Sequence, residues 1–297
     1  MKRRIIATML VLALMMMGLP QFVLADAAPG DEIVSLGADL SEEQKQSLLN
    51  EMDVSENVMT VTVTNKEEHE YLGDYISKAQ IGTRAISSSK ITIGEKGDGL
   101  TVETNHINWV TADMYKSALA TAGVEDAHIY ATAPFDVSGT AALTGLLKAY
   151  ETSTGEAIAE DVKQAANQEM VTTAKLGEDL GKEEATQLVT AIKSELANNT
   201  PQNKEEMQNL IQTQTEKLNL NITDEQLNNL TDLFMNLKDI NIDWNAVGDR
   251  MGEMKQKVDE FLNSEQGQNF LDRIGNFIKS VVSAIGDFFS GLLSSNN

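Results

Sequence analysis

The chain has 297 residues with 45 acidic and 23 basic side chains, which gives a formal net charge of −22 at neutral pH, and it contains no cysteine. This charge argues against nucleic acid as a partner, because binding to phosphates needs a basic surface, and it disfavours docking on anionic lipid. The absence of cysteine excludes disulfides, thiol nucleophiles, cysteine-ligated zinc and a lipid anchor on an N-terminal cysteine.

Residues 1–25 have the layout of a secretory signal peptide. Cationic residues at positions 2–4 precede an apolar run over residues 5–19, and Ala25 stands before the predicted cleavage site at Asp26. The apolar run is short for a bilayer span, which favours cleavage over anchoring. Cleavage leaves 20 cationic and 45 acidic side chains, a formal charge of −25. We therefore expect a secreted protein, extracellular or in the cell-wall zone.

Residues 26–155 are predicted to form a mixed α/β domain with a small sheet. The first helix begins with a capping box, in which Ser41 and Gln44 each bond the other's backbone. A turn at residues 94–99 predicts that the strands on either side of it form a hairpin. The predicted strands lie at residues 58–64, 85–93, 100–107 and 127–133, and the predicted helices at 41–52, 67–76, 111–122 and from 138 toward 150.

Residues 156–297 are predicted to be all-helical, so the fold class is α+β. No convincing strand follows Gly155, and a second capping box is expected at Thr223 and Gln226. Apolar residues recur at helical spacing in three stretches: Leu188, Val189, Ile192 and Leu196; Leu227, Leu230, Leu233, Phe234 and Leu237; Met251, Met254, Val258, Phe261 and Leu262.

The last predicted helix, over residues 270–292, is the most amphipathic. Packing against neighbouring helices is the first interpretation of its apolar side. A groove on another envelope protein, or self-association, is the second. Membrane contact is not favoured, because the polar side has few of the Lys and Arg residues that assist interfacial binding.

The histidines do not form a recognisable metal or catalytic motif. His69, His106 and His128 are not spaced for a helical zinc site. The charged cluster at residues 67–70 is predicted to be a solvated helix surface. A Ser-His-Asp triad can assemble from distant residues, but the G-x-S-x-G elbow is absent. We predict no metal site and no cofactor.

The segment from Asp239 to Asn245 resembles the beginning of a calcium loop. Oxygen-bearing residues occupy its first, third and fifth positions. However, Trp244 stands where the loop needs glycine, and Arg250 stands where it needs a bidentate glutamate. We therefore expect a loop in which Asp243 caps the following helix.

The best candidate for a ligand site is the start of the helix after residue 137. Ser138, Gly139 and Thr140 follow a predicted strand and open a helix, where backbone amides can hold an anion. The glycine fingerprint and the phosphate-binding lysine of nucleotide loops are missing. The plain alternative is that Ser138 or Thr140 caps the helix. A phosphate or carboxylate ligand is the functional alternative.

Several short motifs of the chain are distinctive. They are LGADLSEEQ at 36–44, TVTN at 62–65, EYLG at 70–73, IGTRAISS at 81–88, NWVT at 108–111, ALATAG at 118–123, APF at 133–135 and SGTAALTG at 138–145. With these motifs the chain resembles the YpuA-like family of secreted proteins from low-GC Gram-positive bacteria. The resemblance runs from about residue 31 to the C-terminus and is densest before residue 155. It implies a protein of a Gram-positive envelope with a domain of unknown function, and it carries over no catalytic residue.

Two functional hypotheses follow. The first is a secreted, non-enzymatic protein of the cell envelope that binds a protein, a wall polymer or itself. The second is a secreted hydrolase or small-ligand enzyme with its site near residues 138–145. A deep pocket that holds His106 or His128 beside an acid and a nucleophile would favour the enzyme.

Overall fold

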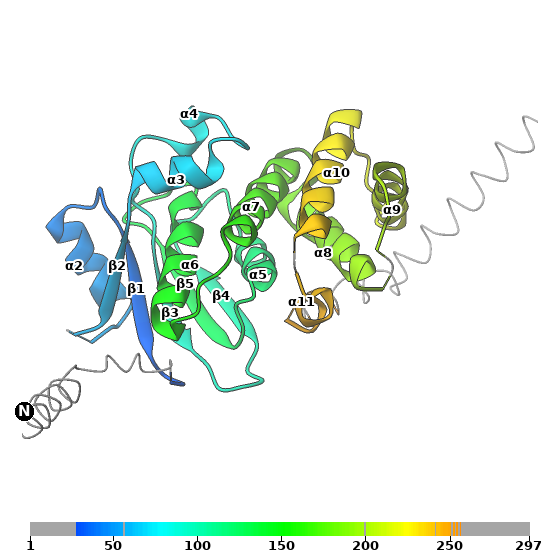
Figure 1. The fold of residues 1–297 in the computed structure, drawn as a ribbon. Coiled ribbons are helices and arrows are strands. Elements are labelled where there is room, and N and C mark those ends of the chain that lie inside the picture. The colour runs from blue at the N-terminus through cyan, green and yellow to red at the C-terminus, as the bar shows by residue number, and fades with distance from the viewer. Residues whose placement is uncertain are drawn as a thin grey trace, which may run out of the picture.

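The computed structural model describes residues 28–250 apart from 56, 199 and 241, together with residues 252, 254 and 256. The predicted signal peptide and the predicted helix over residues 270–292 lie outside the described residues. Within the described part, a five-stranded mixed sheet is followed by a run of helices (Figure 1). The predicted α+β class is confirmed, and the predicted division of the chain at residue 155 stays a prediction.

The strands pair in the order β2-β1-β3-β5-β4. The two outer pairs, β1 with β2 and β4 with β5, are parallel, whereas β3 is antiparallel to both of its neighbours. The strands are β1 (Glu32–Gly37), β2 (Met59–Val63), β3 (Ser88–Ile93), β4 (Leu100–Thr104) and β5 (Ala127–Thr132).

The predicted hairpin between β3 and β4 is wrong, because β5 lies between these two strands. Asp126, just before β5, holds both ends of the turn. Its carbonyl accepts from Gly94 N at 2.6 Å, and its carboxylate accepts from Gly99 N at 2.8 Å. The turn therefore bridges two strands that are not neighbours.

Strand β1 was not expected from the sequence, and its burial explains why. Five of its six residues are buried, so it lacks the alternation of polar and apolar residues that marks a half-exposed strand. Helix α6 (Thr140–Thr154) lies very close to it. A Cβ added at Gly145 would overlap the Ser35 side chain, so the glycine and the small serine allow this approach.

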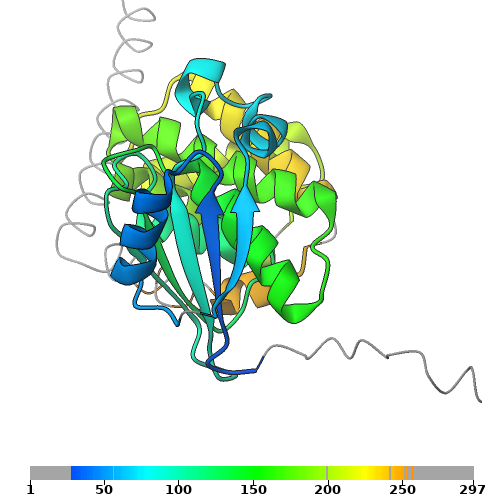
Figure 2. The ribbon, with the colours of Figure 1, turned by 90° about the vertical axis from the view of Figure 1, so that its left-hand side faces the viewer.

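Helices cover the two faces of the sheet unequally (Figure 2). Helices α5 (Ala112–Thr121) and α6 pack on the face that carries Ile33, Ile91 and Ile129. Helix α2 (Glu42–Glu51) packs on Val34 and Leu36 of the opposite face.

Four helices of the described chain begin with a capping box. The two predicted boxes, at Ser41 of α2 and Thr223 of α10 (Asp224–Asp239), are confirmed. Thr64 and Ser77 begin the other two helices in the same way. These are α3 (Asn65–Leu72) and α4 (Lys78–Ile81).

Helix α7 contributes to two hydrophobic cores. Met170 and Ala174 belong to the core under the sheet, while Leu176 belongs to the core of the helical part. No helix in the described ranges is both long enough and apolar enough to cross a bilayer. The C-terminal helices are α7 (Glu160–Leu180), α8 (Lys182–Asn198), α9 (Lys204–Lys217), α10 (Asp224–Asp239) and α11 (Trp244–Arg250).

A buried ion pair joins the two parts of the molecule. Lys193 Nζ of α8 lies 2.9 Å from Glu169 Oε1 of α7, and both side chains are 1 % exposed. Two hydroxyls of α5, Ser117 and Thr121, also bond the Glu169 carboxylate and lie within 3.1 Å of Lys193 Nζ. Burial lowers the pKa of Lys193, and the charge of Glu169 opposes this effect.

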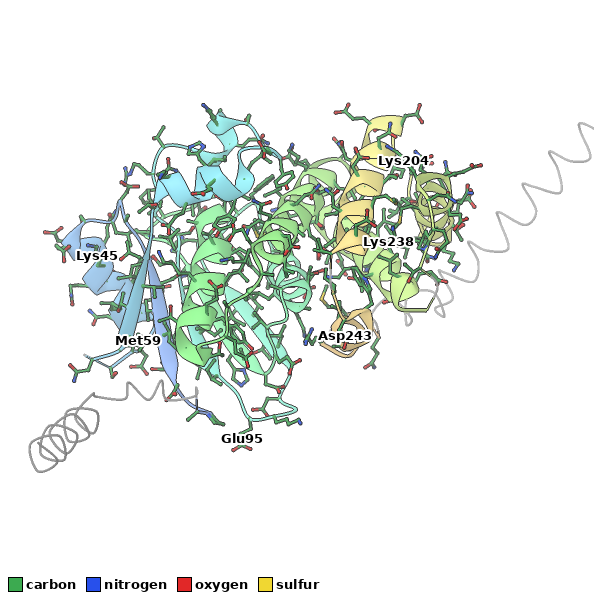
Figure 3. The ribbon with its side chains drawn as sticks, viewed as in Figure 1. Lys45, Met59, Glu95, Lys204, Lys238 and Asp243 are labelled. Carbon is green, nitrogen blue, oxygen red and sulfur yellow. The ribbon has the colours of Figure 1, made fainter. Side chains whose placement is uncertain are left out.

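The surface of the described chain offers few apolar contacts. Met59 on the edge strand β2 (Figure 3) and Phe135 are the only large apolar side chains that are exposed among these residues. A contiguous apolar patch is the usual mark of a protein docking site. Polar recesses are therefore the features of the described surface to examine for a ligand.

Candidate functional site

Helix α6 starts at a glycine that no side chain could replace. Gly139 has φ = 95°, and a Cβ there would overlap Ile107 and Tyr115. The Tyr115 hydroxyl also donates to the Gly139 carbonyl. The interpretation that Ser138 or Thr140 caps the helix is wrong, because Gly139 is the cap residue and no side-chain cap is present. The first amides of α6 thus lack the usual side-chain acceptor.

The predicted site residues lie in a cavity of about 300 Å³, which we name the α6 recess. The segment between α4 and β3 forms one wall, and the start of α6 forms the other. Helix α3 supplies Glu68. The recess is lined by Glu68, Gln80, Ile81, Gly82, Thr83, Arg84, Ile86, Ser87, Val137, Ser138, Gly139 and Thr140.

Glu68 is a carboxyl group in the protein interior. Its side chain accepts from Thr140 Oγ1 at 3.0 Å and from Asn65 Nδ2 at 3.1 Å, and the residue is 2 % exposed. Burial raises the pKa of Glu68 to about 7, although the bonds from Asn65 and Thr140 lower it and the charge of Asp39 adds to the rise. Near neutral pH, this carboxyl can hold or release a proton.

Glu68 was missed from the sequence, because the cluster at residues 67–70 was predicted to be solvated. The helical spacing contained a signal. Glu68 lies four residues before Leu72, which in turn lies four residues before Ile76, and both are buried. A charged residue in phase with a buried apolar stripe is a candidate for a perturbed carboxyl.

Two further groups of the α6 recess have no partner among the described residues. Arg84 is exposed and makes no ion pair there. Ser87 is 5 % exposed, and its hydroxyl makes no hydrogen bond to the described chain. An unpaired guanidinium, a free hydroxyl and the start of a helix are all groups that bind anions.

None of the three histidines lines this recess, although His69 lies beside Gly82, which does. His69 Nε2 is 3.1 Å from the Gly82 carbonyl, and His106 Nδ1 is 2.9 Å from Asp136 Oδ1. His128 Nδ1 is 2.5 Å from Thr101 Oγ1 on the exposed sheet face. Across residues 28–250, where described, no three His, Asp or Glu side chains come close enough to hold a metal ion.

The segment after α10 is organised as a helix start. Asp243 accepts from Ala246 N at 3.1 Å, so its predicted role as the cap of α11 is confirmed. Asp239 Oδ1 lies 2.5 Å from Lys238 Nζ. That calcium does not bind here stays a prediction.

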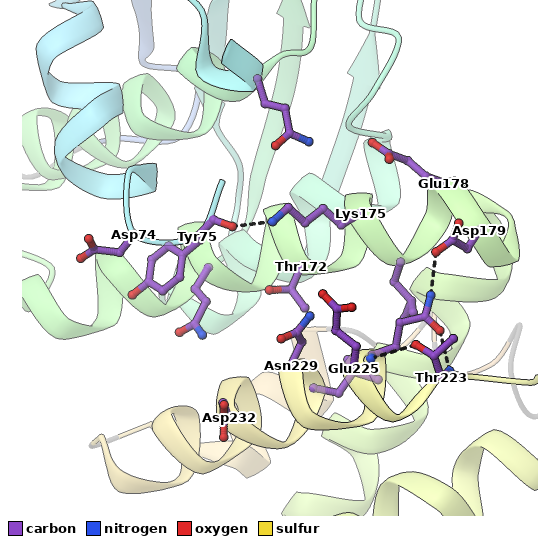
Figure 4. A pocket seen from close by; sticks show the side chains of 15 residues that line it. Asp74, Tyr75, Thr172, Lys175, Glu178, Asp179, Thr223, Glu225, Asn229 and Asp232 are labelled. Atoms are coloured by element: carbon purple, nitrogen blue, oxygen red, sulfur yellow. Dashed lines mark hydrogen bonds between the residues drawn. The ribbon is translucent and has the colours of Figure 1, made fainter. Parts of the chain in front are cut away.

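A larger groove of about 650 Å³ lies between α7, α10 and the segment after α3 (Figure 4). Lys175 is its one basic side chain, and its ammonium bonds the Tyr75 carbonyl at 2.6 Å. Because the whole chain has a net charge of −22, an acidic groove follows from composition and does not identify a ligand. Its carboxylates are those of Asp74, Glu178, Asp179, Glu225 and Asp232.

Comparison with known proteins places the chain in a family. The family model described as "Protein of unknown function (DUF1002)" matches residues 36–254. The chain is 54 % identical over 282 residues to the "Uncharacterized protein YpuA" of Bacillus subtilis (strain 168), which covers 95 % of this chain and 97 % of that protein. No solved structure matches. The resemblance to YpuA-like proteins is thus confirmed, and the chain belongs to the DUF1002 family.

Proposed function

We propose that this protein is a secreted, non-enzymatic binding protein of the Gram-positive cell envelope, and that its α6 recess holds an acidic group of the ligand. The layout of residues 1–25 supports secretion. The observation that carries the binding proposal is the convergence of Arg84, Ser87 and the uncapped start of α6 on one cavity. The acidic group is a carboxylate or a phosphate.

The unpaired arginine in this cavity is notable because the chain as a whole is strongly acidic. Acidic side chains outnumber basic ones about two to one, 45 against 23, so an unpaired arginine in a recess is unusual here. The helix start adds partial positive charge, and the Ser87 hydroxyl can donate to an oxygen of the ligand. A wall polymer that bears phosphates or carboxylates fits these groups better than an apolar protein surface does.

The protonation of Glu68 couples this binding to pH. Below about pH 7 the Glu68 carboxyl is neutral and tolerates an anion beside it. At higher pH its negative charge repels the anion. Asp39 and Tyr115, the other ionisable groups coupled to it, carry no positive charge, and Arg84 of the same recess is the cation that the anion would bind. Binding should therefore take up a proton and weaken as the pH rises from 6 to 8.

A secreted enzyme is the second candidate, and the raised pKa of Glu68 favours it. A carboxyl with a pKa of about 7 suits general acid–base catalysis at neutral pH. Yet His106, which bonds an acid, lies exposed and outside the α6 recess. The two candidates differ in one variant: Glu68→Gln retains ligand binding in a binding protein, whereas an enzyme would also lose turnover.

The binding test uses mature protein that begins at Asp26. Calorimetric titrations with acetate and with inorganic phosphate, at pH 6 and pH 8, distinguish the two acidic groups. Arg84→Gln should weaken binding by about tenfold or more, because a charge-assisted hydrogen bond is lost. The control Lys96→Gln removes an equal charge from an exposed site and should change little. Failure of both anions to bind at pH 6 would refute the proposed site.

Secretion is tested on protein recovered from culture medium and cell-wall fractions. Mass spectrometry should find an N-terminus between Asp26 and Ala28. Recovery of extracellular protein that retains Met1 would contradict the cleavage.

A further inference from the structure

The groove of about 650 Å³ between α7, α10 and the segment after α3 has the size of a ligand pocket, since such pockets measure about 300–1,000 Å³. We name it the α7–α10 groove. It shares only Gln80 with the α6 recess, so its walls offer separate evidence. Its carboxylates alone identify no ligand. The neutral side chains that line it are more informative, because the net charge of the chain does not explain them.

Gln168 of α7 places a hydrogen-bond donor in the wall of this groove. The residue is 7 % exposed, and its Oε1 accepts from Asn236 Nδ2 at 3.2 Å. That bond leaves the amide nitrogen as the free end, and Nε2 makes no hydrogen bond within the described chain. The unpartnered atoms that are sealed from solvent there belong to Thr144, Asn167 and Thr190, so this nitrogen reaches the groove. A carbonyl oxygen of a ligand would satisfy it.

Two further neutral side chains of the groove are free to bond a ligand. Thr172 follows Gln168 by one helical turn and lies on the same face of α7. Its hydroxyl makes no bond within the described chain, whereas that of the neighbouring Thr173 donates to the Glu169 carbonyl at 2.7 Å. Asn229 of α10 lines the other wall, also without a side-chain bond to described residues (Figure 4). A hydroxyl and an amide both donate and accept, as the N–H and C=O groups of a polypeptide backbone require.

Two carboxylates of the groove have no partner in the part of the chain that the structure describes. Asp74 lies on the wall after α3, and Glu225 lies in the first turn of α10. The other three carboxylates bond Trp109, Gln226 and Lys204. Lys175 is the one basic side chain of the lining, and its ammonium bonds the Tyr75 carbonyl. The groove thus holds five carboxylates against one ammonium and attracts positive charge.

A metal ion does not account for these groups. No three His, Asp or Glu side chains in the described ranges come close enough to hold one. The lining also includes Tyr75, Leu176 and Leu230, whose apolar surface an inorganic ion would not use. Lysine and arginine side chains combine a long apolar stem with a charged end, so they match a wall that carries both apolar groups and carboxylates.

We propose that the α7–α10 groove binds a polypeptide segment rich in lysine or arginine. Asp74 and Glu225 pair with its cationic side chains, and Gln168, Thr172 and Asn229 bond its backbone. The proposal does not rest on the anion site of the α6 recess, so either one can fail alone. A free polyamine is the competing occupant, because it carries the positive charge but has no carbonyl oxygen for Gln168.

Fluorescence anisotropy of mature protein with a short, blocked and labelled peptide of alternating lysine and alanine tests the site. Physiological salt screens general attraction to an acidic protein. Glu225→Gln should weaken binding about two- to fivefold, the range of an exposed ion pair. Gln168→Met keeps the size of the side chain and removes the amide, and it should weaken binding about three- to tenfold, as for one lost hydrogen bond. Thr172→Val removes a half-buried hydroxyl and gives the same test should Gln168→Met not fold.

Glu205→Gln is the matched control for charge. Glu205 is exposed at the second position of α9, as Glu225 is in α10, but it lies outside the groove. Peptide binding that falls in Glu225→Gln and Gln168→Met, and survives Glu205→Gln and Arg84→Gln, supports the proposal. It is overturned if the peptide does not bind, if Glu225→Gln and Glu205→Gln act alike, or if the peptide binds no better than spermidine, a polyamine of similar charge.

Discussion

Glu68 combines two properties that rarely occur together. It is almost fully buried, and its two hydrogen-bond donors are neutral side chains with no cation among them. Burying a charged carboxylate without a positive partner costs free energy, so the protonated form is favoured in the folded protein. This makes the stability of the protein depend on pH in a definite direction.

We expect Glu68→Gln to change how stability depends on pH. The pKa of Glu68 is about 7 in the folded protein and 4.5 ordinarily, so the folded state binds the proton more tightly. The stability from this group is full below about pH 4.5 and is lost as the pH rises through 7, by up to about 3 kcal/mol. The glutamine side chain of the variant cannot ionise, so the variant does not undergo this loss.

Urea unfolding at pH 5 and pH 8 measures this effect. The stability of the variant relative to wild type should rise between the two pH values. The control Glu70→Gln changes an exposed carboxyl on the same helix, and it should give nearly the same difference at both. A constant difference for Glu68→Gln would show that its carboxyl titrates normally.

At the residue scale, the sequence pointed to the start of α6 as a candidate site but not to the other groups that line its recess. Ser138, Gly139 and Thr140 were identified because a strand followed by a helix start is recognisable. Glu68, Arg84 and Ser87 come from segments more than 50 residues away, and only the fold brings them together. Whether each of these side chains has a hydrogen-bond or ion-pair partner depends on the tertiary structure, so no local sequence pattern predicts it.

At the element scale, local chemistry predicted most of the described helices and every described strand except β1. The boxes at Ser41 and Thr223 were predictable because they are completed within four residues. Strand β1 was not, because burial on both faces removes the alternation. The β3–β4 hairpin was wrong because turn residues report a reversal of the chain, not which strand pairs with which.

At the scale of the whole molecule, Glu169 and Lys193 join the sheet part to the helical part. Both charged groups are buried away from water. Each forms an ion pair with the other and hydrogen bonds with hydroxyls of α5. The cost of desolvating two charges can cancel the attraction in such a pair. Removing one partner leaves the other buried and uncompensated.

We therefore expect the two substitutions to be strongly non-additive. Lys193→Met alone should destabilise the protein by about 3–5 kcal/mol, because Glu169 remains charged and buried. Adding Glu169→Gln should recover much of this loss, since glutamine can still bond Ser117 and Thr121. A double-mutant cycle by urea unfolding measures the coupling. Additive losses would mean that the pair contributes no mutual stabilisation.

The place of β5 in the sheet has a consequence for how the chain reaches its native state. Strands β3 and β4 are consecutive in the sequence and are joined by a short turn. Asp98 Oδ2 stabilises this turn by accepting a hydrogen bond from Glu95 N at 2.8 Å. Local contacts form first, so the two strands can pair early, in an arrangement that must open before β5 inserts. We expect stopped-flow refolding to contain a slow phase that Asp98→Ala accelerates by weakening the turn. Every newly made chain would meet the same early pairing, and single-exponential refolding of wild-type protein would argue against it.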